Sequence, residues 1–159
     1  MKVICSWRLR KKLKTNSFRL KVLTEKIAES AMLGLTENEI LSLNFIGRKT
    51  MRRINREFLD HDYLTDVICF NYRKDADYIP GEDTAVEIFI SPDIALERAE
   101  ENPELTVESE LLLYLTHAVL HAAGMNDSTP AEKALMRIEE QRILNSVRQA
   151  GFQFPVKNI

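Results

Sequence analysis

Three side chains of this sequence could bind one metal ion together: His117, His121 and Asp127, in the string HAVLHAAGMND. On a helix, histidines four residues apart place both imidazoles on one face, about one turn from each other. Gly124 permits the left-handed backbone that ends a helix, so the chain can turn back and bring Asp127 to the same ion. Two imidazoles and a carboxylate with an open fourth position are typical of catalytic zinc, and they also suit other divalent transition metals.

A purely structural interpretation of these residues is also open. Histidines in buried helices are often hydrogen-bonded core residues, and aspartate is common in turns. Three observations favour the metal site. Two histidines in the most apolar helix would need two separate buried partners if they were only core residues. Gly124 falls where the chain has to turn. Asp127 is not needed as the cap of the next helix, because Thr129 already serves as that cap.

The residue after His117 limits the chemistry. Zinc proteases with a similar histidine spacing use a glutamate directly after the first histidine as general base. Here that residue is Ala118, which cannot accept a proton. Peptide hydrolysis by that mechanism is therefore disfavoured, and the sequence identifies no catalytic residue beyond the metal ligands.

The elements that must position these residues follow from hydrophobic periodicity and from glycine and proline. Strands are predicted at 3–7, 40–46, 66–72 and 86–91, and helices at 17–33, 48–59, 92–101, 106–123 and 130–149. The 106–123 helix is nearly all apolar at its centre, so we expect it to be the buried central helix. The mixed order of elements predicts an α+β fold, a small mixed sheet packed with helices, in one domain spanning 1–159 with the metal site on the central helix.

Capping residues suggest where the helices begin and end. Ser17 is expected to cap the first helix and Gly34 to end it, and Ser91 is expected to cap the helix that starts at the following proline. Thr129 and Glu132 form a capping box at the start of the last helix.

Composition and charge indicate the class of protein and of partner. The chain has 159 residues, 45% hydrophobic and 29% charged, as in ordinary globular domains. Cys5 and Cys69 form no CxxC pair, and no secretory signal or membrane span is apparent, so we expect no disulfide and a cytoplasmic protein.

The net charge is −2, but basic residues gather near the N-terminus and again at Arg52, Arg53 and Arg56. This asymmetry hints at an anionic partner such as RNA, and a solvated helix face is the alternative.

Two motifs in order resemble the YbeY family of bacterial ribosomal RNA maturation factors. The stretch HAVLHAAGMND is similar to that family's HGxLHLxGYDH signature, and INREFLDHDYLTDVICF is similar to its NxxYRxxDxPTDVLSF block, with the strand VEIFIS between them. The matching residues are Asn55, Asp62, Thr65, Asp66, Val67, Phe70, His117, Leu120, His121 and Gly124. The resemblance covers roughly residues 40–145.

The resemblance implies a single α+β domain and one zinc ion per chain held by the histidine motif. It also implies single-strand-specific endoribonuclease activity in ribosomal RNA maturation and ribosome quality control, with precursor ribosomal RNA and the ribosome as partners. On this basis Arg52, Arg53 and Arg56 are candidate RNA-binding residues. Two rival functions stay open: a metal-dependent hydrolase of another substrate, and a non-catalytic RNA-binding factor associated with the ribosome.

The sequence departs from the family pattern at two positions. The third metal ligand is usually histidine in the family, whereas here the position is Asp127. A carboxylate binds zinc well, but its negative charge makes the ion a weaker Lewis acid. The family's arginine falls on Leu59, so any phosphate contact made by that arginine would have to come from elsewhere, such as Arg56.

Five further residues carry weaker expectations. Asp66, with Thr65 before it, either orients a metal-ligand imidazole or only begins a strand. Glu87 is expected on the exposed face of a strand, with a role as general base or hydrogen-bond acceptor as the alternative. His61 is expected in a surface loop, and Trp7 in the core rather than as a stacking platform for bases.

Overall fold

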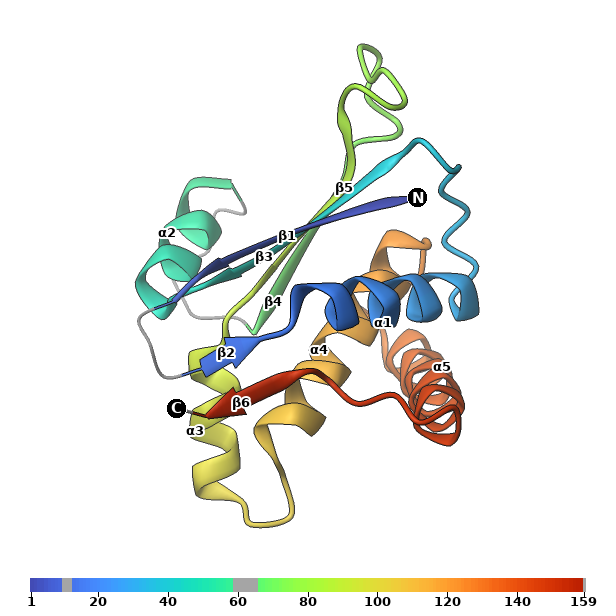
Figure 1. The fold of residues 1–159 in the computed structure, drawn as a ribbon. Coiled ribbons are helices and arrows are strands. Elements are labelled where there is room, and N and C mark those ends of the chain that lie inside the picture. Colours follow the sequence, from blue (N-terminus) through green and yellow to red (C-terminus); the bar gives the residue numbers. More distant parts are fainter. Residues whose placement is uncertain (10–12, 59–65, 159) are drawn as a thin grey trace.

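The computed structural model describes residues 1–9, 13–58 and 66–158. In this part the helices are α1 (Ser17–Ser30), α2 (Arg48–Phe58), α3 (Pro92–Glu101), α4 (Val107–Ala122) and α5 (Pro130–Gln149). The strands are β1 (Lys2–Arg8), β2 (Leu13–Thr15), β3 (Ile40–Ile46), β4 (Val67–Asn71), β5 (Thr84–Ile90) and β6 (Val156–Asn158). Figure 1 shows their arrangement along the chain.

The main sheet has four strands in the order β1-β3-β5-β4. β1, β3 and β5 are parallel, whereas β4 pairs antiparallel with β5 and forms one edge. The predicted α+β fold with a small mixed sheet is therefore confirmed. A second sheet pairs β2 antiparallel with β6, which the sequence did not predict because three-residue strands carry too short a pattern.

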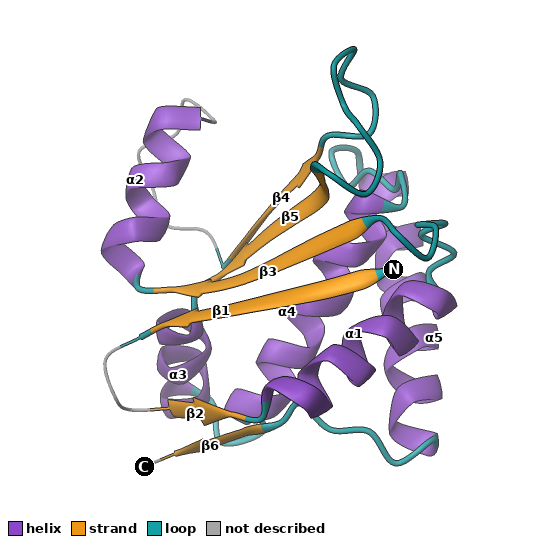
Figure 2. Cartoon of the chain, turned by 45° about the horizontal axis from the view of Figure 1, so that its top comes forward, coloured by secondary structure: helices purple, strands orange, loops and turns teal. Residues whose placement is uncertain are grey.

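The helices divide unequally between the two faces of the main sheet. Figure 2 shows α2 on one side and α1, α3, α4 and α5 on the other. The larger core lies on the side of α1 and α4, where it includes Leu23, Leu43, Ile88, Leu115 and Val119, all of which are fully buried. The predicted buried central helix is α4. On the opposite side α2 packs through a much smaller cluster, formed by Ile46, Met51, Ile54 and Ile68.

The helix ends follow the prediction except in α1. Asn16, rather than Ser17, caps α1 by accepting a hydrogen bond from the Arg19 N–H, because the backbone of Ser17 is already helical. Met32, rather than Gly34, takes the first left-handed position after α1, with φ of 55°. Its N–H donates to the Glu29 carbonyl and its side chain is 86% exposed, so no core packing opposes this conformation.

The later helices begin as predicted. Thr106 and Thr129 cap α4 and α5, each in a capping box, and the second box uses Glu132. Ser91 is the N-cap residue of α3, but its hydroxyl makes no capping hydrogen bond. Cys5 and Cys69 are both free thiols, as expected. Within the described residues, none of the helices is long and apolar enough to cross a membrane.

Candidate metal centre

The last two turns of α4 and the loop after it bring His117, His121 and Asp127 together. The two Nε2 atoms of the histidines lie 2.9 Å apart. Asp127 Oδ2 lies 3.3 Å from Nε2 of His117 and 3.4 Å from Nε2 of His121. Among the described residues, these three form the one group of histidine, cysteine and acidic side chains close enough to hold a metal ion.

The chemistry of these donor atoms fits a divalent ion. A tetrahedral ion with bonds of about 2.0–2.2 Å holds its ligand atoms roughly 3.3–3.5 Å apart. The two distances to Asp127, 3.3 and 3.4 Å, match this value, and the distance between the imidazoles is slightly shorter at 2.9 Å. When both rings are neutral and carry their hydrogen on Nδ1, all three atoms are acceptors, and a cation among them removes their mutual repulsion.

The other ring nitrogen of each histidine has its own hydrogen-bond acceptor. Nδ1 of His117 lies 3.2 Å from Oε1 of Glu140, on α5. Nδ1 of His121 lies 2.9 Å from the backbone carbonyl of Met125. Both acceptors place the ring hydrogen on Nδ1, which leaves the Nε2 lone pair of each ring directed at the shared point.

The turn after α4 positions two parts of this centre. The Gly124 N–H donates to the His121 carbonyl and the Met125 N–H to the Leu120 carbonyl, which is the Schellman arrangement. Gly124 has φ of 105°, a backbone conformation that other residues rarely adopt. The turn aims the Met125 carbonyl back at His121 and carries the chain on to Asp127.

Two side chains from the segment around β4 hold the same end of α4. The Asn71 amide and the Arg73 guanidinium both donate to the Ala122 carbonyl, each at 3.0 Å. Arg73 also donates to the Leu33 carbonyl after α1. The turn between the candidate ligands His121 and Asp127 is therefore tied to the main sheet and to α1.

The electrostatic surroundings of the centre are acidic. Burial disfavours the charged form of His117, whereas the hydrogen bond and negative charge of Glu140 favour it. Together with the charges of Asp127 and Asp66, they raise the pKa of His117 above its ordinary value. Negative charge that stabilises an imidazolium also stabilises a metal cation in the same place.

The centre is open to solvent on one side. The side chains of His117, His121 and Asp127 are 26%, 30% and 38% exposed. A hollow of about 1130 Å³ lies elsewhere, between the start of α1, the start of α4 and the β2–β6 sheet, and none of the three residues lines it.

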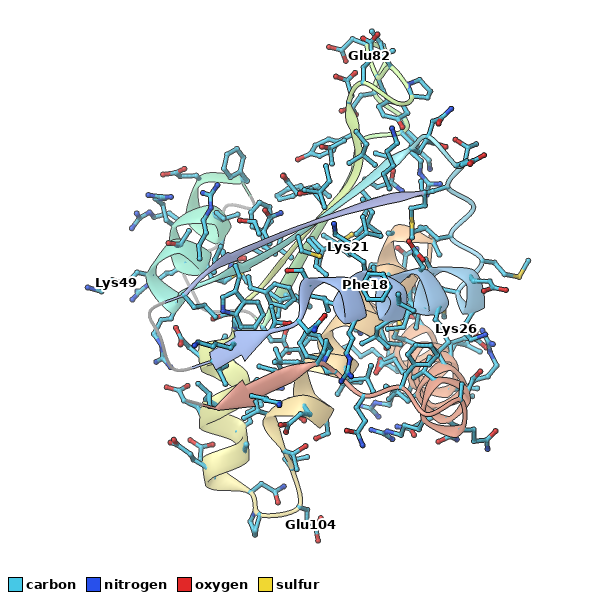
Figure 3. All side chains as sticks on the ribbon, in the orientation of Figure 1. Phe18, Lys21, Lys26, Lys49, Glu82 and Glu104 are labelled. Carbon is cyan, nitrogen blue, oxygen red and sulfur yellow. The ribbon has the colours of Figure 1, made fainter. Side chains whose placement is uncertain are left out.

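The three candidate RNA-binding arginines, Arg52, Arg53 and Arg56, are all exposed on α2. Figure 3 shows Lys49 pointing outward from the same helix. α2 lies on the other side of the sheet from α4, so these arginines do not join the metal centre.

The weaker expectations have mixed outcomes. Asp66 forms an ion pair with Arg98 at 3.5 Å, and the carboxylate hydrogen-bonded to His117 is Glu140 instead. Glu87 is half-buried and accepts a hydrogen bond from Tyr72, and Trp7 packs on Phe45 at the margin of the core. Leu59, His61, Asp62 and Thr65 lie outside the described residues.

Sequence reasoning missed Glu140, although a signal was present. Glu140 lies on the same stripe of α5 as Met136, Ile143, Leu144 and Val147, all of which are buried. Its own side chain is only 12% exposed. A carboxylate on the apolar stripe of a helix needs a partner, and this could have identified Glu140 as a contact of a buried polar site.

Comparisons with known proteins agree with this fold and identify the family. The sequence profile of the family described as Endoribonuclease YbeY matches residues 7–148. The Endoribonuclease YbeY of Elusimicrobium minutum is 40% identical over 124 residues, which cover 75% of this chain and 83% of that protein. The Endoribonuclease YbeY of Chlorobium limicola is 34% identical over 140 residues, which cover 85% of this chain and 92% of that protein.

A solved structure has the same fold. The solution structure of a protein from Thermotoga maritima aligns with a TM-score of 0.56 over 93% of each chain, at 22% sequence identity. The family profile spans most of the sequence, including all three residues of the candidate metal centre. The chain belongs to the endoribonuclease YbeY family.

Proposed function

We propose that this protein is a metal-dependent endoribonuclease that cuts single-stranded RNA during ribosomal RNA maturation and ribosome quality control. The observation that carries the proposal is the convergence of three donor atoms on an open surface, each histidine being fixed through its second nitrogen. The relatives named Endoribonuclease YbeY support the RNA substrate.

In this proposal His117, His121 and Asp127 hold one zinc ion or a similar divalent transition metal. When bound, such an ion makes water more acidic and polarises a phosphate oxygen of the substrate. Glu140 and the Met125 carbonyl keep the two imidazoles in the tautomer and orientation that binding requires. The open side of the centre admits the phosphodiester and the attacking water.

Arg52, Arg53 and Arg56 attract the RNA backbone from the opposite side of the sheet. Exposed guanidinium groups bind phosphate oxygens with little demand on sequence, which suits an enzyme that recognises an unpaired strand. Arg56, in the last turn of α2, also takes over the phosphate contact that the family's arginine would make at position 59. Precursor ribosomal RNA within the ribosome is the proposed substrate, the protein acts in the cytoplasm, and residues 1–159 act as one domain.

The test combines metal content with RNA cleavage. Purified protein is analysed for metals, stripped with a chelator, and reloaded with zinc, manganese or nickel. Each form is incubated with a single-stranded oligoribonucleotide and with its duplex. We expect about one ion per chain, and cleavage of the single strand that disappears on stripping and returns on reloading.

Other outcomes would favour one of the two rivals. Metal binding without RNA cleavage, together with hydrolysis of a peptide or amide in a substrate panel, would indicate a hydrolase of another substrate. RNA binding that survives metal removal, with no hydrolysis of any substrate, would indicate a non-catalytic ribosome-associated factor.

A further inference from the structure

We propose that Phe58, Phe70 and Tyr72 form a platform on which bases of single-stranded RNA stack, on the face of the main sheet that carries α2. We call these three residues the aromatic platform. The inference rests on the proposed function, because the RNA on the platform is the same strand whose backbone reaches the metal centre.

Among the described residues, the face of the sheet that carries the platform is only partly covered. Side chains alternate along a strand, and one set packs into the main core under α1 and α4. The other set includes Ile4, Ser42, Glu87 and Phe70, which the strand register places in one row across all four strands. Ile4 is 53% exposed and the other three are only partly buried, so the cover that α2 gives to this row is incomplete. Phe70 packs against the α2 cluster, whereas Ile4 is not part of it. Figure 2 shows α2 over one end of the strands only.

The three rings lie next to one another. Phe70 and Tyr72 are two residues apart along the line of β4, with ring centroids 6.1 Å apart and ring planes only 11° from parallel. Phe58, at the end of α2, meets Phe70 edge-on at 6.2 Å, and its side chain is 67% exposed. Phe89 supports Phe70 from β5 at 6.1 Å. Phe70 thus lies among the other rings and supports them, and the exposed Phe58 and the partly exposed Tyr72 offer the stacking area to bases.

Tyr72 is fixed in place, as a stacking residue should be. Its N–H donates to the Ala85 carbonyl, which keeps it in line with β4, and its hydroxyl donates to Glu87 at 3.0 Å. Burial, together with the charge and hydrogen bond of Glu87, raises the pKa of Tyr72 to about 12, so the ring stays neutral at physiological pH. A fixed ring loses little conformational entropy when a base stacks on it.

Charge on the neighbouring helix indicates which occupant the platform suits. α2 contributes Phe58 and also carries the exposed Arg52, Arg53 and Arg56. Proteins that bind single strands without reading their sequence combine aromatic rings, on which the bases stack, with basic side chains along the phosphate backbone. Four-stranded sheets with aromatic side chains on an open face bind RNA in the same way. A paired duplex keeps its bases inside and has none to offer.

The edge strand β4 connects the platform with the metal centre. Successive residues of a strand point to opposite faces. Accordingly, Tyr72 lies on the platform, whereas the adjacent Asn71 donates to the Ala122 carbonyl, next to His121. One strand of RNA that stacks on the platform and passes over the edge at β4 therefore reaches the metal centre.

The test measures how much of the RNA affinity depends on the bases. Metal-loaded full-length protein is titrated with a fluorescent phosphorothioate oligoribonucleotide, which resists cleavage, and with an abasic strand of equal length and charge. We expect the wild type to bind the strand with bases at least about fivefold more tightly, as expected for stacking worth 1 kcal/mol or more per base. Phe58→Leu and Tyr72→Leu should each bring the two affinities closer together.

Three variants serve as controls for ring chemistry and for location. Phe58→Trp and Tyr72→Phe keep an aromatic ring and should retain the preference for bases. Phe18, on α1, is 75% exposed and lies outside the platform (Figure 3), so Phe18→Leu matches Phe58→Leu in chemistry and should behave like the wild type. Because Phe58 is exposed at a helix end, its replacement by leucine is expected to leave the fold intact.

The outcomes separate this inference from the proposed function. If Phe58→Leu and Tyr72→Leu keep the wild-type preference for bases while the wild type cuts RNA, the platform is wrong and the endoribonuclease stands. If the wild type cuts RNA but binds both strands equally, this face has another occupant, such as a protein segment, and the inference is again overturned. If the bases contribute affinity through these rings but no RNA is cut, the platform stands and the proposed activity fails.

Discussion

The candidate metal centre and the proposed RNA-binding surface, which consists of the α2 arginines and the aromatic platform, are built in different ways. In the metal centre each histidine is fixed by a second hydrogen bond, and the helix that carries both lies in the main core. On the proposed RNA-binding surface the arginines are exposed, and among the described residues their helix packs through a small cluster of four buried residues. Binding a metal ion requires atoms at fixed distances, whereas binding a flexible polyanion requires charge and area.

The largest expected effect is the loss of the metal ligands. We expect His117→Ala, His121→Ala and Asp127→Ala each to weaken metal binding by more than about 100-fold. Replacing a residue that only supports a metal ligand lowers affinity by up to about 100-fold, and losing the ligand itself should cost more. Asp127→His should keep the ion, because imidazole is also a good zinc ligand. Elemental analysis after dialysis, with circular dichroism as a check of folding, measures this.

The third histidine of the chain is the control for this series. His61→Ala should retain the metal content of the wild type, since the proposed ligand set consists of His117, His121 and Asp127. Folded ligand variants with a full metal content would exclude the proposed centre.

The next effect concerns the residue that supports His117. Glu140→Ala should lower metal affinity by about 10- to 100-fold, because the His117 ring then loses the acceptor that orients it. Glu140→Gln should lose less, since an amide oxygen still accepts the hydrogen bond. Competition with a chromophoric chelator measures both affinities.

Glu139 offers a matched control on the same helix. It is bound to Arg142 on the surface, and Glu139→Ala should leave metal affinity unchanged. Equal losses in the Glu139 and Glu140 variants would mean that α5 contributes negative charge in general rather than a positioned hydrogen bond.

The two regions also differ in how far the sequence predicted them. The pair His117 and His121 is local, so helical spacing was enough to place both rings on one face, and Gly124 signalled the turn that brings Asp127 back. Glu140 is 23 residues from His117 and comes from another helix, so its contact depends on how α4 and α5 pack. The platform likewise combines the end of α2 with the edge of the sheet, which no local pattern predicts.

The same distinction holds for the fold. Strands of five to seven residues and helices with glycine, proline or capping boxes at their ends were predicted within a few residues. The β2–β6 sheet was missed because it pairs three-residue segments from the two ends of the chain. At the start of α1, Asn16 and Ser17 are both good capping residues, and only the backbone geometry decides between them.

The turn after α4 gives a smaller effect that links stability to the metal centre. Gly124→Ala should lower the free energy of unfolding by about 1–2 kcal/mol, because φ of 105° strains a residue with a side chain. No atom lies within 4 Å of the added methyl group, so the cost is conformational rather than steric. The strained turn should also move the Met125 carbonyl and weaken metal binding.

Gly151 has the same property far from the metal centre. It has φ of 83° and open space around an added methyl group, so Gly151→Ala should cost a similar free energy of unfolding without any loss of metal affinity. Urea unfolding of both variants, together with chelator competition, makes the comparison. Equal metal affinities in the two variants would show that the turn only terminates α4 and does not position the ligands.

The smallest effects are expected on the RNA-binding surface, where no single contact dominates. Arg53→Gln and Arg56→Gln should each weaken single-stranded RNA binding by only a few fold and reduce the slope of log affinity against log salt concentration by about 0.7 for each lost phosphate contact. Cleavage at saturating RNA should stay near the wild-type rate, because neither side chain reaches the metal centre. Arg19→Gln removes an equally exposed arginine from α1 and should leave the slope unchanged. If the Arg53 and Arg56 variants instead lost cleavage at saturating RNA, these arginines would act on the reacting phosphate, and the separation between a fixed metal centre and an adaptable RNA-binding surface would be wrong.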